Sequence, residues 1–225
     1  MKIVSIVNSV NIFLFTLTIS LLYSLETSAQ QVEIPQASRF TGSYYDKFFG
    51  GGPVLSFPVS NKDFIDSRSI KGLRFFYREI INDRVSAGFD LSYSAYNDYI
   101  PPQVYQSASS AIYTDIYNSL EQYTVTISGE YNFKPESRLM PYAGLGAGAG
   151  YTSVALYYNI YNDSERKWSG VVRPYAGATF RFSEKSEWAV FTTLSIDHSF
   201  VKLPDYDYNG FSALNLQFGL VFLDW

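Results

Sequence analysis

A chain of 225 residues with no cysteine and a formal net charge of −4 has room for one domain or two small ones. The lack of cysteine excludes disulfides as a source of stability, and the acidic balance offers no basic face for a nucleic-acid partner. Tyrosine, phenylalanine and tryptophan are abundant (20, 18 and 3), and the mean hydropathy is close to zero. This composition fits alternating apolar and polar positions better than helical membrane spans.

The N-terminus has the pattern of a secretory signal peptide. Lys2 precedes an apolar run over residues 11–23, and the small residues of Thr27-Ser28-Ala29 offer a cleavage site. The run is short for a spanning helix, which needs about 20 residues, so we favour cleavage over an uncleaved anchor. We therefore predict a signal peptide over residues 1–29 and one exported domain over residues 30–225.

The exported part contains about eight runs in which bulky apolar residues alternate with small or polar ones. In chain order they cover residues 44–57, 69–80, 85–95, 121–133, 140–156, 170–182, 187–200 and 211–225. A period of two is the side-chain alternation of a β-strand. Most runs exceed the roughly 9–11 tilted residues that cross a bilayer as a strand.

The connectors alternate in length. They are short after the second, fourth and sixth runs and generally longer after the others. We predict loops over residues 96–120, which contain Pro101-Pro102, over residues 159–169, and over the acidic, tyrosine-rich residues 203–209. Transmembrane barrels have short periplasmic turns and longer extracellular loops. With an even number of strands, both termini are then expected on the periplasmic side.

A soluble β-sandwich or lipocalin-like barrel is the competing fold, because it also has many alternating strands. In those folds the apolar face points inward. Here the other face carries the smallest residues, mainly Ser, Thr, Gly and Asn, which suits a cramped polar interior with the bulky face toward lipid. We therefore predict an all-β fold, an eight-stranded antiparallel up-and-down transmembrane β-barrel.

The parity of the runs assigns charged residues of both signs to the interior. This predicted lumen charge network comprises Arg74, Arg78, Asp90, Glu130, Arg173, Arg181 and Asp197. It is either a charged pore or ligand site, or a set of salt bridges that fills the lumen. Because opposite charges can satisfy one another where water is scarce, we favour a structural plug.

A glycine-rich run carries a family resemblance. Glycine occupies every second position from Gly144 to Gly150, which is a strand period, and Pro141 starts the run. The segment PYAGLGAGAGY at residues 141–151 resembles a recurrent strand of the superfamily of small outer-membrane β-barrels related to the outer-membrane protein A and X barrels. A second copy of its core, PYAG, begins at Pro174. The resemblance implies a bacterial outer-membrane location and insertion by the barrel-assembly machinery. Pro174 removes a ladder donor, so we expect its strand to begin later or to carry a bulge.

The resemblance also assigns a role to the C-terminus. In this superfamily the assembly signal has a terminal aromatic residue with another two positions before it. Here Trp225 is the terminal aromatic, Leu223 takes the second position, and Phe222 is out of phase. We predict that Trp225, Leu223 and Phe222 form the assembly signal, with Trp225 anchored at the periplasmic interface.

The sequence contains no complete pattern of catalytic residues. His198 is the only histidine, and adjacent residues on a strand face opposite sides, so it cannot pair with Ser199. The His-x-Ser pattern of lipid A deacylases is absent, because position 200 is phenylalanine. With no cysteine and a single histidine, no metal or cofactor site is predicted.

We expect no enzyme, but a monomeric outer-membrane barrel of the structural, adhesion or surface-interaction type. Its expected partners are outer-membrane lipid and a possible surface ligand bound through the tyrosine-rich loops. A small porin-like channel for solutes is the alternative hypothesis, and a lipid A-modifying enzyme is the third.

Overall fold

The chain forms eight strands and no other long element in the part that is described. The computed structural model describes residues 46–62, 64–107, 110–158, 161–183, 186–203 and 208–224, so the predicted signal peptide and Trp225 lie outside the described residues. The strands are β1 (Lys47–Pro58), β2 (Ser69–Asn82), β3 (Val85–Ser107), β4 (Ser110–Asn132), β5 (Leu139–Tyr158), β6 (Tyr161–Arg181), β7 (Trp188–Leu203) and β8 (Tyr208–Asp224). No helix that is long and apolar enough to cross a membrane is found among the described residues.

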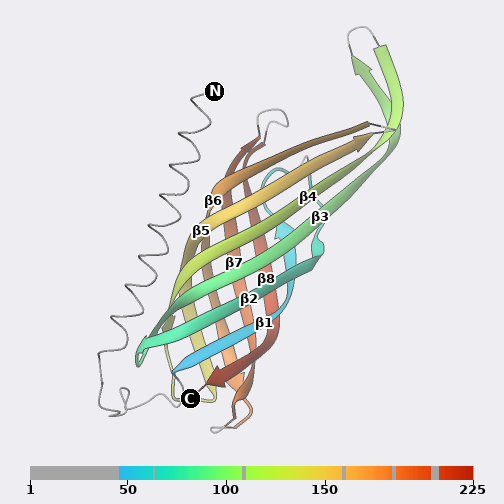
Figure 1. Cartoon of the computed structure of the whole chain (residues 1–225). Helices are drawn as coiled ribbons and strands as arrows, with labels where there is room; N and C mark the ends of the chain where they lie inside the picture. The colour runs from blue at the N-terminus through green and yellow to red at the C-terminus, as the bar shows by residue number, and fades with distance from the viewer. Residues whose placement is uncertain are drawn as a thin grey trace, which may run out of the picture. The chain divides into compact units, whose positions relative to one another are not determined.

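The eight strands close into a barrel. Each strand pairs antiparallel with the next, and β8 pairs with β1 from Lys47↔Asp224 to Pro58↔Ala213. The ring has no open edge over the paired length, and Figure 1 shows its strands tilted steeply around the barrel. The predicted up-and-down topology is confirmed. The start of β1 and the end of β8 lie at the end that carries the short turns.

The alternation along each strand separates an apolar exterior from a polar interior. On β2, the side chains of Leu73 and Phe75 are exposed, whereas Arg74 between them is 3% exposed. On β8, Phe218 and Leu220 are exposed, whereas Gln217 is 1% exposed. A water-soluble barrel has the reverse arrangement. The chain is therefore built to face lipid, as a transmembrane barrel.

Two predicted loops are strands instead. Residues 96–107 belong to β3 and residues 110–120 to β4, and all described residues of the 159–169 segment belong to β6. Pro101 and Pro102 are tolerated because β2 pairs with β3 only as far as Tyr93, so the missing donors face an unpaired edge. On the side of β4, a register shift between Ile100 and Gln103 leaves both prolines without a paired residue, so no ladder hydrogen bond is required of them.

The expectation for the strand at Pro174 is wrong. Strand β6 runs through Pro174, which pairs with Leu145, and no register shift interrupts β6 on either side. The β6–β7 ladder instead skips Arg173 and Pro174 and resumes in the same register at Tyr175↔Ser195. The missing N–H of Pro174 therefore costs the β6–β7 ladder two residue pairs, and regular pairing on both sides of this gap keeps the strands together.

Candidate functional site

An apolar layer fills the extracellular end of the barrel. Its buried members are Ile65, Tyr96, Leu120, Val154, Val201, Phe211 and Ala213. Ile65 belongs to the connector between β1 and β2, which folds into the mouth and leaves its side chain fully buried. The Asn118 amide of β4 donates to the carbonyl of Phe64 at 2.8 Å and so fixes this connector over the lumen. We call this set the outer apolar layer.

A second apolar layer closes the periplasmic end. It consists of Phe48, Met140, Ala189, Phe191, Val221 and Leu223, with Phe76 and Ile80 packed against it. The rings of Phe76 and Phe191 meet edge to face, with 5.0 Å between their centroids. This inner apolar layer contains side chains from five strands, β1, β2, β5, β7 and β8, so it bridges the lumen rather than lining one wall.

Between the two layers lies a polar layer with two arginine centres. In the first, Arg173 is fully buried and donates from Nε and Nη2 to the two oxygens of Asp197, at 2.7 and 2.6 Å. The same Nη2 donates to Ser92 Oγ at 2.8 Å and to Thr124 Oγ1 at 2.9 Å. Arg74 lies on the other side of Asp197, with 3.7 Å between Nη2 and Oδ1. The bidentate contact between Arg173 and Asp197 is the strongest form of a charged hydrogen-bonded pair.

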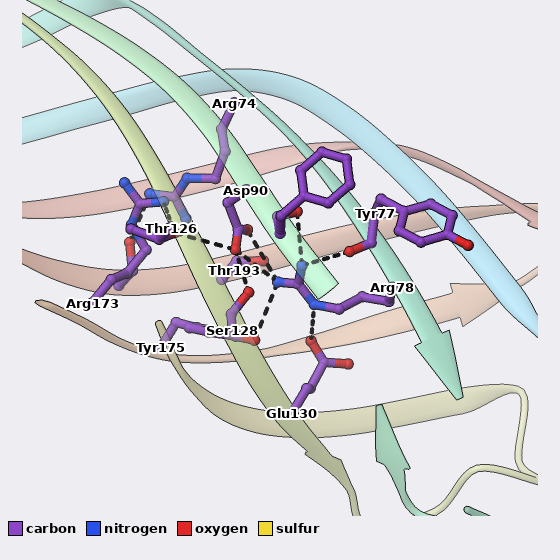
Figure 2. Close-up of polar contacts among 12 residues, drawn as sticks. Arg74, Tyr77, Arg78, Asp90, Thr126, Ser128, Glu130, Arg173, Tyr175 and Thr193 are labelled. Atoms are coloured by element: carbon purple, nitrogen blue, oxygen red, sulfur yellow. Dashed lines mark hydrogen bonds and ion pairs between the residues drawn. The ribbon is translucent and has the colours of Figure 1, made fainter. Parts of the chain in front are cut away.

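The second centre is Arg78, shown in Figure 2. Its Nη2 donates to both oxygens of Asp90, at 3.0 and 3.2 Å, and to the Tyr175 hydroxyl at 3.2 Å. Its Nε lies 3.7 Å from Glu130 Oε2. Asp90 also accepts from Ser128 Oγ at 2.5 Å. Thr126 links the two centres, because its hydroxyl contacts both Asp90 and Arg173.

The structure brings six of the seven predicted lumen charges together and separates Arg181. That side chain is buried, but its Nη2 donates to the carbonyls of Glu136 and Ser137 in the β4–β5 turn, at 3.2 and 3.1 Å. The hydroxyl partners of the arginines were not singled out from the sequence. Their signal was available, because Ser92, Thr124 and Thr126 share the inward parity of the charged residues on neighbouring strands.

Little space is left in this interior. The cavity beside Arg78, Glu130 and Tyr175 has a volume of about 20 Å³. That volume is enough for about one water molecule. The polar layer beside Arg78 is therefore closely packed by its own side chains.

The exterior of β4 shows where the membrane ends. Its outward residues are aromatic or apolar from Tyr131 to Tyr123, become polar at Glu121 and Ser119, and become aromatic again at Tyr117. Tyr131 and Tyr123 are eight positions apart, which is about 27 Å along a strand and about 20 Å along the membrane normal at a tilt of about 40°. This length matches the apolar band of about 25 Å in such barrels once ring sizes are added.

Beyond that band, strands β3 to β6 continue as an extracellular sheet, which comprises residues 94–107, 110–122, 152–158 and 161–167. Figure 1 shows the β3–β4 hairpin projecting from its end. Tyr99, Tyr117 and Tyr157 lie side by side in register on its outward face and are 56%, 40% and 43% exposed. Tyr117 is six residues beyond Tyr123, or about 15 Å further from the membrane at the same tilt.

The hairpin tip continues this aromatic surface. Tyr113 is 72% exposed and Val104, its register partner, is also exposed. Residues 99–114 contain no charged side chain. Apolar and aromatic side chains gathered on a surface that faces water are typical of interaction sites. We call Tyr99, Tyr113, Tyr117 and Tyr157 the tyrosine face.

A His–Ser hydrogen bond lies outside the barrel wall. His198 Nδ1 is 2.8 Å from Ser212 Oγ on the neighbouring strand β8, while Ser199 faces inward and bonds Ser169 at 2.7 Å. The prediction that His198 cannot pair with Ser199 agrees with this geometry, but it missed the cross-strand partner. No contact between His198 and a carboxylate is found in the described part of the chain, so the third member of a catalytic triad is not in place there.

Comparison with known proteins finds similarity of fold. No protein-family model matches the chain, and no curated protein sequence matches it. Among solved structures, Ail, the attachment invasion locus protein of Yersinia pestis, shares 14% identity over 81% of this chain and 100% of its own, with a TM-score of 0.44. Neisserial surface protein A shares 15% identity over 79% and 96%, with a TM-score of 0.48. E. coli outer membrane protein W shares 14% identity over 82% and 100%, with a TM-score of 0.40.

The fold is shown by the geometry of this chain itself, because its eight antiparallel strands close into a ring with an apolar exterior and a polar interior. The chain has the fold of a transmembrane β-barrel.

The three residues that we predict to form the assembly signal lie on different faces of the barrel. Phe222 points outward, where its ring lies 5.2 Å from that of Trp188 and 5.3 Å from that of Phe49. Leu223 points inward and is 2% exposed in the inner apolar layer. Trp225 lies outside the described residues. Recognition of these three residues by the assembly machinery stays a prediction.

Proposed function

We propose that this protein is a closed outer-membrane scaffold that displays the extracellular sheet to a binding partner. The observation that carries this proposal is the tyrosine face, an exposed aromatic surface held about 15 Å beyond the membrane on continuous strands, with one carboxylate, Asp115, between Tyr113 and Tyr117. A membrane-facing role does not account for aromatic side chains at that height. An interaction surface does, because exposed tyrosines give a large contact area at a small entropic cost.

The filled lumen supports a scaffold over the alternative, a small solute channel. A water-filled pathway needs the outer apolar layer, the two arginine centres and the inner apolar layer all to be displaced. Displacing Arg173 or Arg78 leaves buried carboxylates without partners, which is strongly unfavourable. The lumen charge network is therefore best interpreted as a structural plug that keeps the barrel rigid.

The chemistry of the tyrosine face indicates the kind of partner. Around the hairpin, Tyr99, Tyr113 and the exposed amides of Gln103 and Gln106 carry no charge, and Asp115 adds one carboxylate between Tyr113 and Tyr117. Such a surface suits an uncharged partner, bound by ring stacking and by neutral hydrogen bonds. A polyanion requires clustered Arg and Lys side chains instead, which this segment lacks.

Replacement of the tyrosine face should abolish binding and leave the barrel folded. The barrel in lipid nanodiscs is to be screened against a neutral-glycan array and a displayed random-peptide library. Every ligand found is then measured against the variant Tyr99→Ser/Tyr117→Ser/Tyr157→Ser. We expect affinity to fall at least about tenfold, equivalent to 1.4 kcal/mol, because three exposed rings are removed together.

Tyr131→Ser serves as the matched control, since its ring lies at the periplasmic end, where it accepts a hydrogen bond from Arg84. The control should bind as the parent does. A parent that binds none of these probes, or a triple variant that binds as tightly as the parent, would contradict the proposal.

A further inference from the structure

An apolar groove of about 300 Å³ crosses the lipid-facing wall of the barrel. It is separate from the tyrosine face and lies on the membrane side of it. Its upper wall is a row of aromatic side chains on four neighbouring strands, in the register Tyr93↔Tyr123↔Tyr151↔Trp168. The rings pair with one another, at 4.8 Å for Tyr93 and Tyr123 and 5.2 Å for Tyr151 and Trp168, so they do not fold down to fill the space below.

The hollow arises from small residues in the next row. Two positions toward the periplasm, the register Leu91↔Val125↔Ala149↔Gly170 runs from a large side chain to none. At β5 the groove is lined by Ala149, with Tyr151 and Trp168 in the row above it. Its lining extends across β3 and β4 to Leu73 and Phe75 of β2.

The direction and length of the groove match a lipid chain of the outer leaflet. From β2 to β6 it spans four interstrand spacings, or about 19 Å. Half of a hydrocarbon core of about 30 Å is about 15 Å. Figure 1 shows β2 to β6 lying one above another in the front wall, so a groove across these strands rises from β2 toward β6. Its β6 end carries Trp168, and tryptophan is favoured at the membrane interface.

A cation lies just beyond the upper end. Arg166 is on the same face of β6 as Trp168, two residues further from the membrane, and it is exposed. Its neighbour Glu165 pairs with Lys167 at 3.6 Å, and Arg166 has no ion-pair partner in the described part of the chain. Glu121 is an acidic residue on the same face and in the same register row as Arg166. It lies two strands away on β4, with Ser153 of β5 between the two. A guanidinium at that height complements a lipid phosphate.

We propose that this groove is a binding site for one acyl chain of a phosphorylated outer-leaflet glycolipid, with Arg166 contacting its phosphate. The site explains why a row of bulky lipid-facing residues gives way to Ala149 and Gly170 directly beneath an aromatic row. The bound chain takes the place of the missing side chains, and the aromatic row holds it from above. The site does not depend on any ligand of the tyrosine face.

The test counts lipids retained by the intact barrel. The protein is refolded into phosphatidylcholine vesicles that contain a minor fraction of diphosphoryl lipid A, extracted in mild detergent and examined by native mass spectrometry. We expect the parent to retain one lipid A. Ala149→Trp fills the groove and Arg166→Gln removes the charge, and each should lower retention about tenfold, the effect of 1.4 kcal/mol.

Matched controls separate this site from general lipid contact. Ala176→Trp places the same ring on the lipid side of β6 outside the groove, and Arg138→Gln removes an exposed arginine from a periplasmic turn. Both should retain lipid A as the parent does. Equal retention by Ala149→Trp and the parent overturns the site. Equal retention of phosphatidylcholine and lipid A overturns the role of Arg166. A dimer that Ala149→Trp dissociates shows that a second copy, and not lipid, fills the groove.

Discussion

Replacing Arg173 with leucine is expected to lower the free energy of unfolding by about 3–5 kcal/mol, the cost of removing one partner of a buried ion pair. Arg173 supplies both close contacts to Asp197 and also bonds Ser92 and Thr124. Without it, the contacts that remain to Asp197 are Arg74 at 3.7 Å, the Ser195 hydroxyl at 3.4 Å and the side chain of Asn215, none of which is a close ion pair. Urea titration of the barrel in vesicles, followed by the heat-modifiable gel shift of the folded form, measures the loss.

Two further variants identify the cause of that loss. In Arg173→Leu/Asp197→Leu both charges are gone, so much of the stability should return, because an apolar pair of similar volume replaces the ion pair. Arg181→Leu removes an equally buried arginine that bonds turn carbonyls and, among the described residues, no carboxylate, and it should cost only about 1–3 kcal/mol. Equal losses for Arg173→Leu and Arg181→Leu would show that the charge network does not stabilise the lumen.

Phe191→Ala should cost about 3–5 kcal/mol, as for a phenylalanine removed from a packed core. Phe191 is 3% exposed and forms the centre of the inner apolar layer, with the ring of Phe76 at 5.0 Å. Its truncation leaves a cavity that neither lipid nor a neighbouring strand can fill. The same urea titration gives the value.

Phe218→Ala is the matched comparison, because Phe218 is 48% exposed on the lipid side of β8. Both variants lose the transfer free energy of one ring, about 1.5–3 kcal/mol, but lipid chains close over the gap at Phe218. The difference between the two losses is therefore the cavity contribution. A smaller loss at Phe191 than at Phe218 would mean that the periplasmic end of the lumen is open and wet.

The barrel itself was predictable from the sequence because its signal repeats. Every strand shows the same two-residue period, and a single parity rule places Arg74, Arg173 and Asp197 inside and Phe75 outside. A one-residue error in register would have moved all of them to the wrong face. That consistency over eight strands is what distinguishes a transmembrane barrel from a set of unrelated strands.

The extracellular sheet was missed for an equally physical reason. Pro101-Pro102 and the polar residues between 159 and 169 would indicate a loop if both neighbouring strands had to pair with them. On a free edge, or where only one neighbour pairs, they cost little. The sequence does not show that the pairing of β2 with β3 begins only at Leu73↔Tyr93, so it does not show that the prolines lie on an unpaired edge.

Contacts between distant segments could not be predicted from the sequence for the same reason. The His198–Ser212 bond, the separation of Arg181 and the groove beneath Trp168 all depend on how neighbouring strands are aligned. Parity gives the face of each residue but not its height relative to the next strand. For Ala149 and Gly170, that height decides whether small residues form a groove or are scattered singly over the wall.

Conductance across a planar bilayer is the most direct test of a lumen filled by side chains. The refolded barrel, shown to be folded by its heat-modifiable gel shift, is inserted and recorded across a range of voltages. The two apolar layers and the paired arginines predict a flat current with no discrete openings. Reproducible stepwise openings from the folded protein would contradict the closed scaffold and would establish the channel instead.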